Sequence, residues 1–343
     1  MIRSIVLVTP CVLMLIATAN AFDGQPVELG KINWHRSLDK GVQLAEQGQK
    51  PIFLLFQEVP GCHTCQHYGR EVLSHPLIVE AIESLFVPVA IFNNKGGVDK
   101  EVLRYFREPA WNNPVVRIVN AQKENIVPRL SGNYTPLGVV QLMKRALKGQ
   151  FQDVPLYLQL LEAELAAEAK GTKKAVFSMY CFWTGEKEIG GLEGVVETQA
   201  GFMNGREVVE VSYDPSQISY EALLEQAHKS RCADEVFTND PQQKAQSQKK
   251  LGKKAVGQQS AFRPDGQPKY YLYNSVYRHV PMTQLQAARV NSLLGRRQLP
   301  EQVLSPRQQA LVEYIRAHPN HQWPIAINQD FVRAWEKVEH QKS

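Results

Sequence analysis

The sequence predicts an α/β domain followed by an α+β domain, and three observations support this prediction. The chain has 343 residues, which is enough for two domains of ordinary size. Strand-like and helix-like segments alternate up to about residue 150, as in a sheet covered by helices. A Leu-, Ala- and Glu-rich stretch at about 151–172 then separates these segments from a second series. We interpret that stretch as a connector helix.

The first domain, at about 22–150, contains the signal of a buried strand. PIFLLFQ at 51–57 is a short, continuous apolar run, which is typical of a strand covered on both faces. The remaining elements are expected as helices at 32–49, 66–73, 76–86, 98–106 and 137–147, and as strands at 87–92 and 115–119.

The second domain, at about 173–300, begins with KKAVFSMYCFW, a strand that runs toward a helix N-terminus. Further strands are expected at 195–202 and 207–215, with a helix at 218–230. The polar region Thr238–Pro268 contains many Gln, Lys, Gly and Pro residues, so we expect it to be rich in loops. A helical tail at 301–343 closes the chain.

Residues 1–21 have the pattern of a secretory signal peptide. Arg3 precedes a short apolar stretch at 5–16, and Ala-Asn-Ala follows at 19–21. The apolar stretch is shorter than the ~20 residues that a membrane-spanning helix needs. We therefore expect cleavage after Ala21, with secretion across the inner membrane into the periplasm. An uncleaved N-terminal anchor is the alternative.

The composition argues against disorder and against a nucleic-acid partner. Hydrophobic residues make up 43% and charged residues 21%, as in ordinary globular proteins. The net charge of +5 is spread along the chain, and the densest basic run, at 248–254, is short. Such a run is usually a solvated face of the protein. We expect a monomer without a cofactor or a bound metal.

Two of the cysteines that follow the predicted signal peptide form a CxxC motif, Cys62 and Cys65, between the strand at 51–57 and a predicted helix. Backbone N–H groups at a helix N-terminus stabilise a thiolate there. Cys62 is therefore the expected nucleophile, and Cys65 is expected to resolve the mixed disulfide that it forms.

The first domain resembles the thioredoxin-like superfamily, through NWHRSLDKGVQLAEQGQKPIFLLFQEVPGCHTC and Pro114 downstream. VPGCHTC is more narrowly similar to exported thioredoxin-like proteins of the VPGC/U-x-T-C type, in which some members carry selenocysteine at the position of Cys62. The resemblance implies a redox-active disulfide, with Pro114 in a cis-proline loop opposite it. His63 and Thr64 replace the Gly-Pro of thioredoxin, so its redox potential does not carry over.

Two alternatives remain for this motif. Cys62, His63, Cys65 and His67 are soft thiolate and imidazole ligands that suit copper or zinc. Structural zinc sites usually draw their ligands from two separated pairs, and the chain has no second CxxC. The other alternative is an inert structural disulfide.

The segment around Cys181 is similar to peptide methionine sulfoxide reductases of the A family. The matching motifs are CFW, GVVxTxxGF and REVVEVSYDPSQISYEALL, in the order of that family, from about Ala175 to Ser230 and more weakly to about Leu294. From its residues alone, Cys181 is either a thiolate beside an aromatic pocket or a buried core cysteine.

The resemblance implies a mechanism for this site. Cys181 attacks the sulfoxide sulfur, Phe182 and Trp183 hold the substrate methyl group, and Glu207 donates a proton to the oxygen. A second thiol can rescue the resulting sulfenic acid. Cys232 is the candidate resolving thiol, with a buried bystander as the alternative.

The sequence departs from the family pattern at several places. Tyr180 stands where the family commonly has Gly, and Phe202 where it commonly has Tyr, so one hydrogen bond to the sulfoxide oxygen is missing. The second tyrosine of the family matches either Tyr270 or Tyr273. The segment at 197–207 is also shorter than in most relatives.

Together the domains predict an exported enzyme that reduces methionine-S-sulfoxide in proteins or free methionine. Cys62 and Cys65 would supply electrons in cis, at an effective concentration in the ~mM range. A membrane or periplasmic thiol reductant would recharge them. The alternatives are a soft-metal (copper) binding protein and a thiol–disulfide oxidoreductase with an inactive reductase-like domain.

Overall fold

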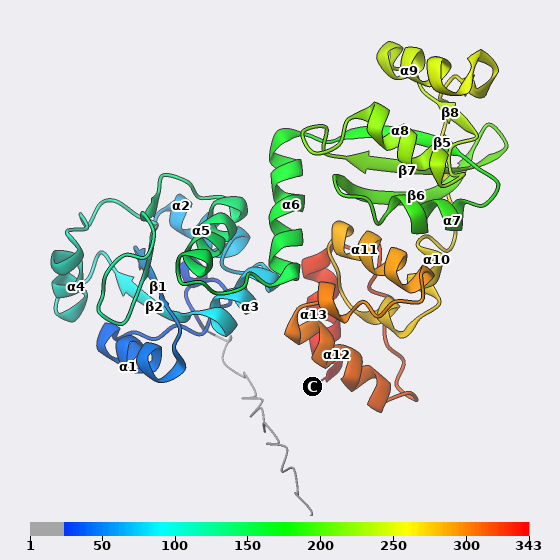
Figure 1. Ribbon diagram of the computed structural model, residues 1–343. Coiled ribbons are helices and arrows are strands. Elements are labelled where there is room, and N and C mark those ends of the chain that lie inside the picture. The colour runs from blue at the N-terminus through cyan, green and yellow to red at the C-terminus, as the bar shows by residue number, and fades with distance from the viewer. Residues whose placement is uncertain (1–23, 343) are drawn as a thin grey trace, which may run out of the picture.

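The structure is a computed structural model that describes residues 24–342. The predicted signal peptide lies outside the described residues. Within the described part, no helix is both long enough and apolar enough to cross a membrane. Two sheet-containing halves lie on either side of the helix α6 (Leu156–Lys170) (Figure 1). The mixed α/β architecture confirms the predicted fold class.

The first half is built around a four-stranded sheet with the order β2-β1-β3-β4. Its strands are β1 (Ile52–Gln57), β2 (Val87–Phe92), β3 (Val115–Val119) and β4 (Leu130–Ser131). β1 runs parallel to β2 and antiparallel to β3. The surrounding helices are η1 (Val27–Leu29), α1 (Leu38–Gly48), α2 (His63–Glu71), α3 (Pro76–Leu85), α4 (Val98–Phe106) and α5 (Pro136–Gly149).

Every side chain of β1 is buried, which explains its continuous apolar sequence. Phe53 and Leu55 pack into the core formed with α2, α3 and α5. Ile52, Leu54 and Phe56 pack on the other face with α1 and α4. Because β1 is fixed on both faces, the CxxC motif that follows it has a defined position.

The second half contains a six-stranded sheet with the order β10-β6-β7-β5-β8-β9. Its strands are β5 (Lys173–Ser178), β6 (Val195–Met203), β7 (Arg206–Tyr213), β8 (Glu235–Phe237), β9 (Val256–Gly257) and β10 (Arg263–Pro264). A tight turn at Asn204 and Gly205, both with positive φ, joins β6 to β7. Since β5 pairs with β7, the beginning of β7 lies beside the end of β5.

The prediction of a loop-rich region at Thr238–Pro268 is wrong for the helix α9 (Pro241–Leu251). Asp240 caps this helix by accepting hydrogen bonds from the backbone N–H groups of Gln242 and Gln243. Pro241 occupies the first helical turn, and Gln, Lys and Ala have good helix propensity. The N-terminal cap therefore indicates a helix where the apolar pattern does not.

The remaining helices are α7 (Phe182–Ile189), α8 (Tyr220–Lys229), η2 (Lys253–Ala255), α10 (Tyr270–Tyr273), η3 (Val276–His279), α11 (Gln284–Gly295), η4 (Glu301–Val303), α12 (Pro306–Ala317) and α13 (Phe331–Lys342). The tail contacts the first half, because Glu80 accepts a hydrogen bond from Arg307 N at 2.8 Å and Lys31 pairs with Glu336 at 2.7 Å. Glu164 on α6 accepts hydrogen bonds from two N–H groups at the start of α11. The tail thus helps to join the two halves.

Candidate redox sites

The first site places two thiols at the start of α2. Cys62 is the N-cap of the helix and is exposed, whereas Cys65 lies one turn later and is fully buried. Their sulfur atoms are 3.6 Å apart, and both thiols are free. A small movement of the two side chains would therefore let the sulfur atoms form a disulfide.

The two thiols differ in acidity. A backbone hydrogen bond from Cys65 lowers the pKa of Cys62 below its usual value. Burial raises the pKa of Cys65 to about 12. Cys62 is thus the thiol that forms a thiolate more readily, and Cys65 stays protonated until the first has reacted.

The loop that carries Pro114 faces the buried thiol. The Asn113–Pro114 peptide bond is cis, and Asn113 Oδ1 accepts a hydrogen bond from Cys65 Sγ at 2.7 Å. Sequence analysis did not single out Asn113, although its place before Pro114 was a usable signal. The structure therefore brings this loop to the dithiol.

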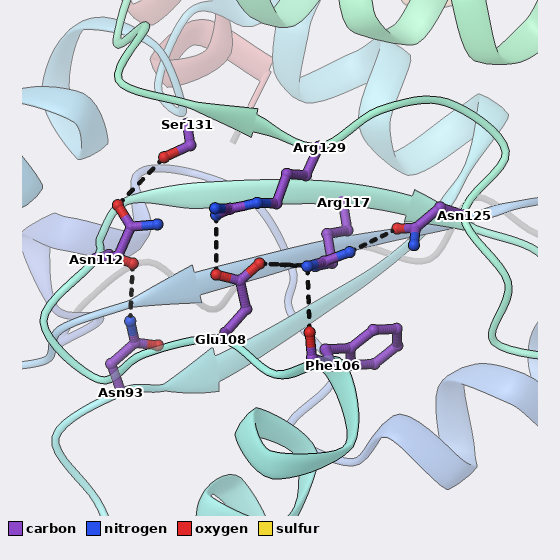
Figure 2. Close-up of polar contacts among 8 residues, drawn as sticks. All are labelled: Asn93, Phe106, Glu108, Asn112, Arg117, Asn125, Arg129 and Ser131. Atoms are coloured by element: carbon purple, nitrogen blue, oxygen red, sulfur yellow. Dashed lines mark hydrogen bonds and ion pairs between the residues drawn. The ribbon is translucent and has the colours of Figure 1, made fainter.

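Polar contacts, with a buried carboxylate among them, fix this loop (Figure 2). The Glu108 carboxylate, whose side chain is fully buried, pairs with Arg117 at 2.6 Å and with Arg129 at 2.9 Å. Asn112 accepts hydrogen bonds from Ser131 Oγ at 3.1 Å and, through its carbonyl oxygen, from Asn93 Nδ2 at 3.4 Å. These contacts hold the segment before Pro114 against β2, β3 and β4.

Gly61 allows the backbone of Glu58 and the side chain of Cys65 to lie close together beside the dithiol. A Cβ atom at this position would lie 2.3 Å from Glu58 O and 2.7 Å from Cys65 Cβ. Its N–H group donates to Glu28 Oε1 at 2.8 Å, and Glu28 is buried. Glycine at this position is therefore needed for the geometry of the motif.

The histidines of the proposed metal set do not join the thiols. His63 and His67 are both exposed, and their rings stack on one another with centroids 6.2 Å apart. Across the described residues, the group of potential ligands that comes together here is Glu58, Cys62 and Cys65. Sequence analysis missed Glu58, which precedes the motif by one short loop.

The second site places Cys181 at the N-cap of α7, where it is partly buried. Glu207 Oε2 accepts a hydrogen bond from the backbone N–H group of Phe182 at 2.9 Å. Glu207 reaches this position because β7 begins beside the end of β5. The structure therefore brings the predicted nucleophile and the predicted acid to the same helix end.

Aromatic rings line this second site. The Phe182 ring contacts the Phe202 ring edge-on at 5.3 Å, and Trp183 stacks on Tyr270 at 4.0 Å. Trp183 also donates its indole N–H to Asp265 at 3.3 Å. Tyr273 instead packs with the apolar cluster of the tail, so Tyr270 is the tyrosine beside the site.

A buried carboxyl group on α7 anchors this helix. Glu186 is fully buried and accepts hydrogen bonds from Ala200 N at 3.1 Å and Lys269 N at 2.7 Å. Burial raises the pKa of Glu186 to about 7, although the charge of Lys269 acts in the opposite direction. These contacts tie α7 to β6 and to the segment before α10. Neither Glu186 nor Lys269 is among the site residues predicted from the sequence.

Cys232 lies in the apolar core of the second half. Its sulfur donates to Ser230 O at 3.3 Å, and burial raises the pKa of its thiol to about 11. The described structure contains no disulfide and no sulfur–sulfur hydrogen bond between Cys232 and Cys181. The predicted resolving pair is therefore not assembled in this arrangement.

The fold and the first site define a thioredoxin-like domain, and the match of one family model agrees with this. Residues 33–121 match a family model described as thioredoxin-like. A solved structure titled DsbH Oxidoreductase is 16% identical, with a TM-score of 0.31, and the match covers 38% of this chain and 94% of that one.

The second relationship is to methionine sulfoxide reductases. Peptide methionine sulfoxide reductase MsrA of Methanoculleus marisnigri is 30% identical over 129 residues, a match that covers 28% of this chain and 77% of that protein. The chain belongs to the peptide methionine sulfoxide reductase A family. Peptide methionine sulfoxide reductase A5 of Oryza sativa is 37% identical, covering 22% of this chain and 35% of that protein. The Geobacter metallireducens MsrA is 39% identical, covering 17% and 46%. The chain thus spans less than half of these last two relatives.

Proposed function

We propose that this chain is an exported methionine-S-sulfoxide reductase that acts on oxidised proteins or free methionine, with electrons from its own Cys62/Cys65 dithiol. The observation that carries the proposal is the 2.9 Å hydrogen bond from Phe182 N to Glu207, directly beside Cys181. Glu207 and Cys181 thus lie at one helix N-terminus in aromatic surroundings, which supports the roles of proton donor and nucleophile that we assign to them.

The first step is reduction of the sulfoxide. The Cys181 thiolate attacks the sulfoxide sulfur while Glu207 protonates the oxygen. The new sulfur–sulfur bond and the substrate sulfur–oxygen bond then break as the hydroxyl group passes to Cys181, giving methionine and a sulfenic acid on Cys181. The substrate is reduced by two electrons, and the enzyme thiol is oxidised by two.

The aromatic rings would position the substrate for this attack. Phe182 and Trp183 form an apolar surface that suits the methyl group of the sulfoxide, and Tyr270 extends it through its stacking on Trp183. Phe202 supplies a ring without a hydroxyl group. The oxygen therefore depends more on Glu207 than it would beside a tyrosine.

The second step regenerates Cys181. Cys62 attacks the sulfenic sulfur, water leaves, and a mixed disulfide forms. Cys65 then loses its proton and attacks Cys62, which frees Cys181 and leaves a Cys62–Cys65 disulfide. The exposure of Cys62 and the burial of Cys232 favour Cys62 for this role. A membrane or periplasmic thiol reductant would restore the dithiol.

Transfer in cis requires the two sites to approach one another. In Figure 1, α2 and α7 lie in separate halves on opposite sides of α6. The halves would have to move about the segment that contains α6, with the tail contacts of Glu80 and Lys31 opened, for the sites to meet. Transfer between two molecules is the alternative, and its rate would depend on protein concentration.

The test is methionine formation from methionine-S-sulfoxide with excess dithiothreitol, which bypasses the first domain. The wild-type protein should form methionine, and Cys181→Ser should form none. Absence of methionine in the wild type, with intact reduction of a test disulfide, would contradict the proposal. It would instead favour a thiol–disulfide oxidoreductase with an inactive reductase-like domain.

A further inference from the structure

A third group lies against the two thiols of the first site. One carboxylate oxygen of Glu58, Cys62 Sγ and Cys65 Sγ all lie within 4.8 Å of one another. Across residues 24–342, this is the one group of three His, Cys, Asp or Glu side chains that comes together in this way. It combines two sulfur ligands with one oxygen ligand.

The spacing of the sulfur atoms suits a tetrahedral metal ion. Two thiolates bound to zinc at about 2.3 Å lie about 3.8 Å apart in tetrahedral geometry. The observed separation of Cys62 and Cys65 is 3.6 Å, so both can bind one ion with little movement. A carboxylate oxygen binds zinc at about 2.0–2.2 Å, and a Glu58 oxygen lies within 4.8 Å of both sulfur atoms.

In the described structure, the Glu58 carboxylate forms no hydrogen bond and no ion pair. It is partly buried, yet no described donor or cation bonds to it, unlike the carboxylates of Glu28 and Glu108. A partly buried carboxylate without a partner favours a ligand that supplies positive charge.

The backbone on both sides of Glu58 is fixed. On one side, Gln57 is buried and its side-chain amide donates to Cys65 O at 3.1 Å. On the other side, the N–H group of Val59 donates to Asn94 Oδ1 at 3.2 Å. These contacts fix the chain around Glu58 relative to the dithiol.

We propose that the reduced dithiol and Glu58 form a binding site for Zn²⁺, with two thiolates and one carboxylate as ligands. The carboxylate oxygen favours Zn²⁺ over Cu⁺, which prefers sulfur ligands. Binding releases the two thiol protons and transfers no electrons. The oxidised protein cannot bind in this way, because its sulfur atoms are joined in a disulfide.

Metal binding and thiol exchange exclude each other at this site. A Cys62 thiolate that coordinates Zn²⁺ is not free to attack a disulfide or a sulfenic acid. Zinc would thus hold the dithiol reduced and inactive until the metal is removed. The proposal does not rest on sulfoxide reduction, because it concerns only residues of the first domain.

The experiment is a titration of the fully reduced, mature protein with Zn²⁺ in competition with a chromophoric chelator. We expect about one ion per chain for the reduced protein, none for the oxidised protein, and at least about tenfold weaker binding by Glu58→Gln. Zn²⁺ should also protect Cys62 from alkylation in the wild type. Equal thermal unfolding of variant and wild type would show that the variant is folded.

Two control variants separate this site from other arrangements. Glu71→Gln removes an exposed carboxylate at the other end of α2 and should not change the affinity. His67→Ala should also have no effect, whereas the histidine-containing set predicts loss of the metal. Unchanged affinity in Glu58→Gln, or Cu⁺ binding by the two thiols with no Zn²⁺ retained, would overturn the proposal.

Discussion

The two thiol sites have the same local structure and opposite surroundings. In each, a buried strand leads to a cysteine at the N-cap of a short helix, Cys62 before α2 and Cys181 before α7. Both cysteines therefore occupy the same position relative to the start of a helix.

The difference lies in what stands beside each thiol. Cys62 has a second thiol 3.6 Å away, and so forms a complete two-electron couple. Cys181 has a carboxyl group and aromatic rings, while Cys232 remains in the core. Under the proposed function, the first site stores electrons and the second receives the sulfoxide. In the part of the chain that the structure describes, no thiol bonds to Cys181.

The largest expected effect is on sulfoxide reduction at the second site, measured separately from disulfide reduction at the first. Glu207→Gln removes the proton donor, so sulfoxide reduction driven by dithiothreitol should fall by about 10²–10⁴-fold. Reduction of a test disulfide should be unaffected, because the first site lacks this group. Cys62→Ser should instead lose reduction of the test disulfide and keep sulfoxide reduction driven by dithiothreitol. If Glu207→Gln impairs both activities equally, the two sites are not chemically independent.

The support of the Pro114 loop gives a large effect on stability. Glu108→Ala leaves Arg117 buried without its carboxylate, and should lower the free energy of unfolding by about 3–5 kcal/mol. Chemical denaturation measures the change. Glu235→Ala breaks the exposed pair with Arg206 in the second half and should cost less than about 1 kcal/mol. Similar losses in both variants would contradict a structural role for the buried network.

Glu164, between the halves, predicts a pH dependence. Burial raises the pKa of this carboxyl group to about 7 in the folded state, against 4.5 when it is solvated. The folded state therefore binds the proton more tightly, so stability should be lost as pH rises from about 5 to 7. The loss reaches about 3 kcal/mol.

Glu164→Gln should remove most of this pH dependence, as measured by denaturation at several pH values. Glu186 titrates over the same range, so the slope should not vanish completely. Glu313→Gln changes an exposed carboxylate and serves as the control. A slope unchanged in Glu164→Gln would show that this group does not control the junction.

The smallest effect expected is a gain. Phe202→Tyr adds a hydroxyl group to a ring that already contacts Phe182. A hydrogen bond of about 1.4 kcal/mol to the sulfoxide oxygen would raise kcat/KM about tenfold. Phe237→Tyr, on another ring of the same half, should not raise it. A loss of activity in Phe202→Tyr would place this ring away from the oxygen.

The sequence predicts the elements that carry the two nucleophiles, because both follow strands with clear apolar patterns, such as 51–57. It also predicts that Glu207 begins a strand. It does not predict Glu58 or Asn113 beside Cys65, since these contacts depend on how two loops fold against each other. Such contacts are set by tertiary packing and have no periodic signal.

Helix geometry explains why the histidines do not join the thiols. Residues four apart lie on the same helix face, so His63 and His67 stack together. Cys62 and Cys65 lie on a neighbouring face, one turn apart. The four potential ligands are close in the sequence, but the helix places the two cysteines on one face and the two histidines on another.

The central claim is that the dithiol of the first half supplies electrons to the second. The most direct test counts methionine formed by fully reduced, mature protein after the external reductant is removed. Each sulfoxide consumes two electrons; Cys181 can supply two on becoming a sulfenic acid, and the Cys62/Cys65 dithiol can supply two more.

We therefore expect about two methionines per chain for the wild type, about one for Cys62→Ser, and none for Cys181→Ser. A rate of the second turnover that does not depend on protein concentration would indicate transfer in cis. A yield of about one methionine in both the wild type and Cys62→Ser would contradict the account, because the dithiol would then supply no electrons to the sulfoxide site.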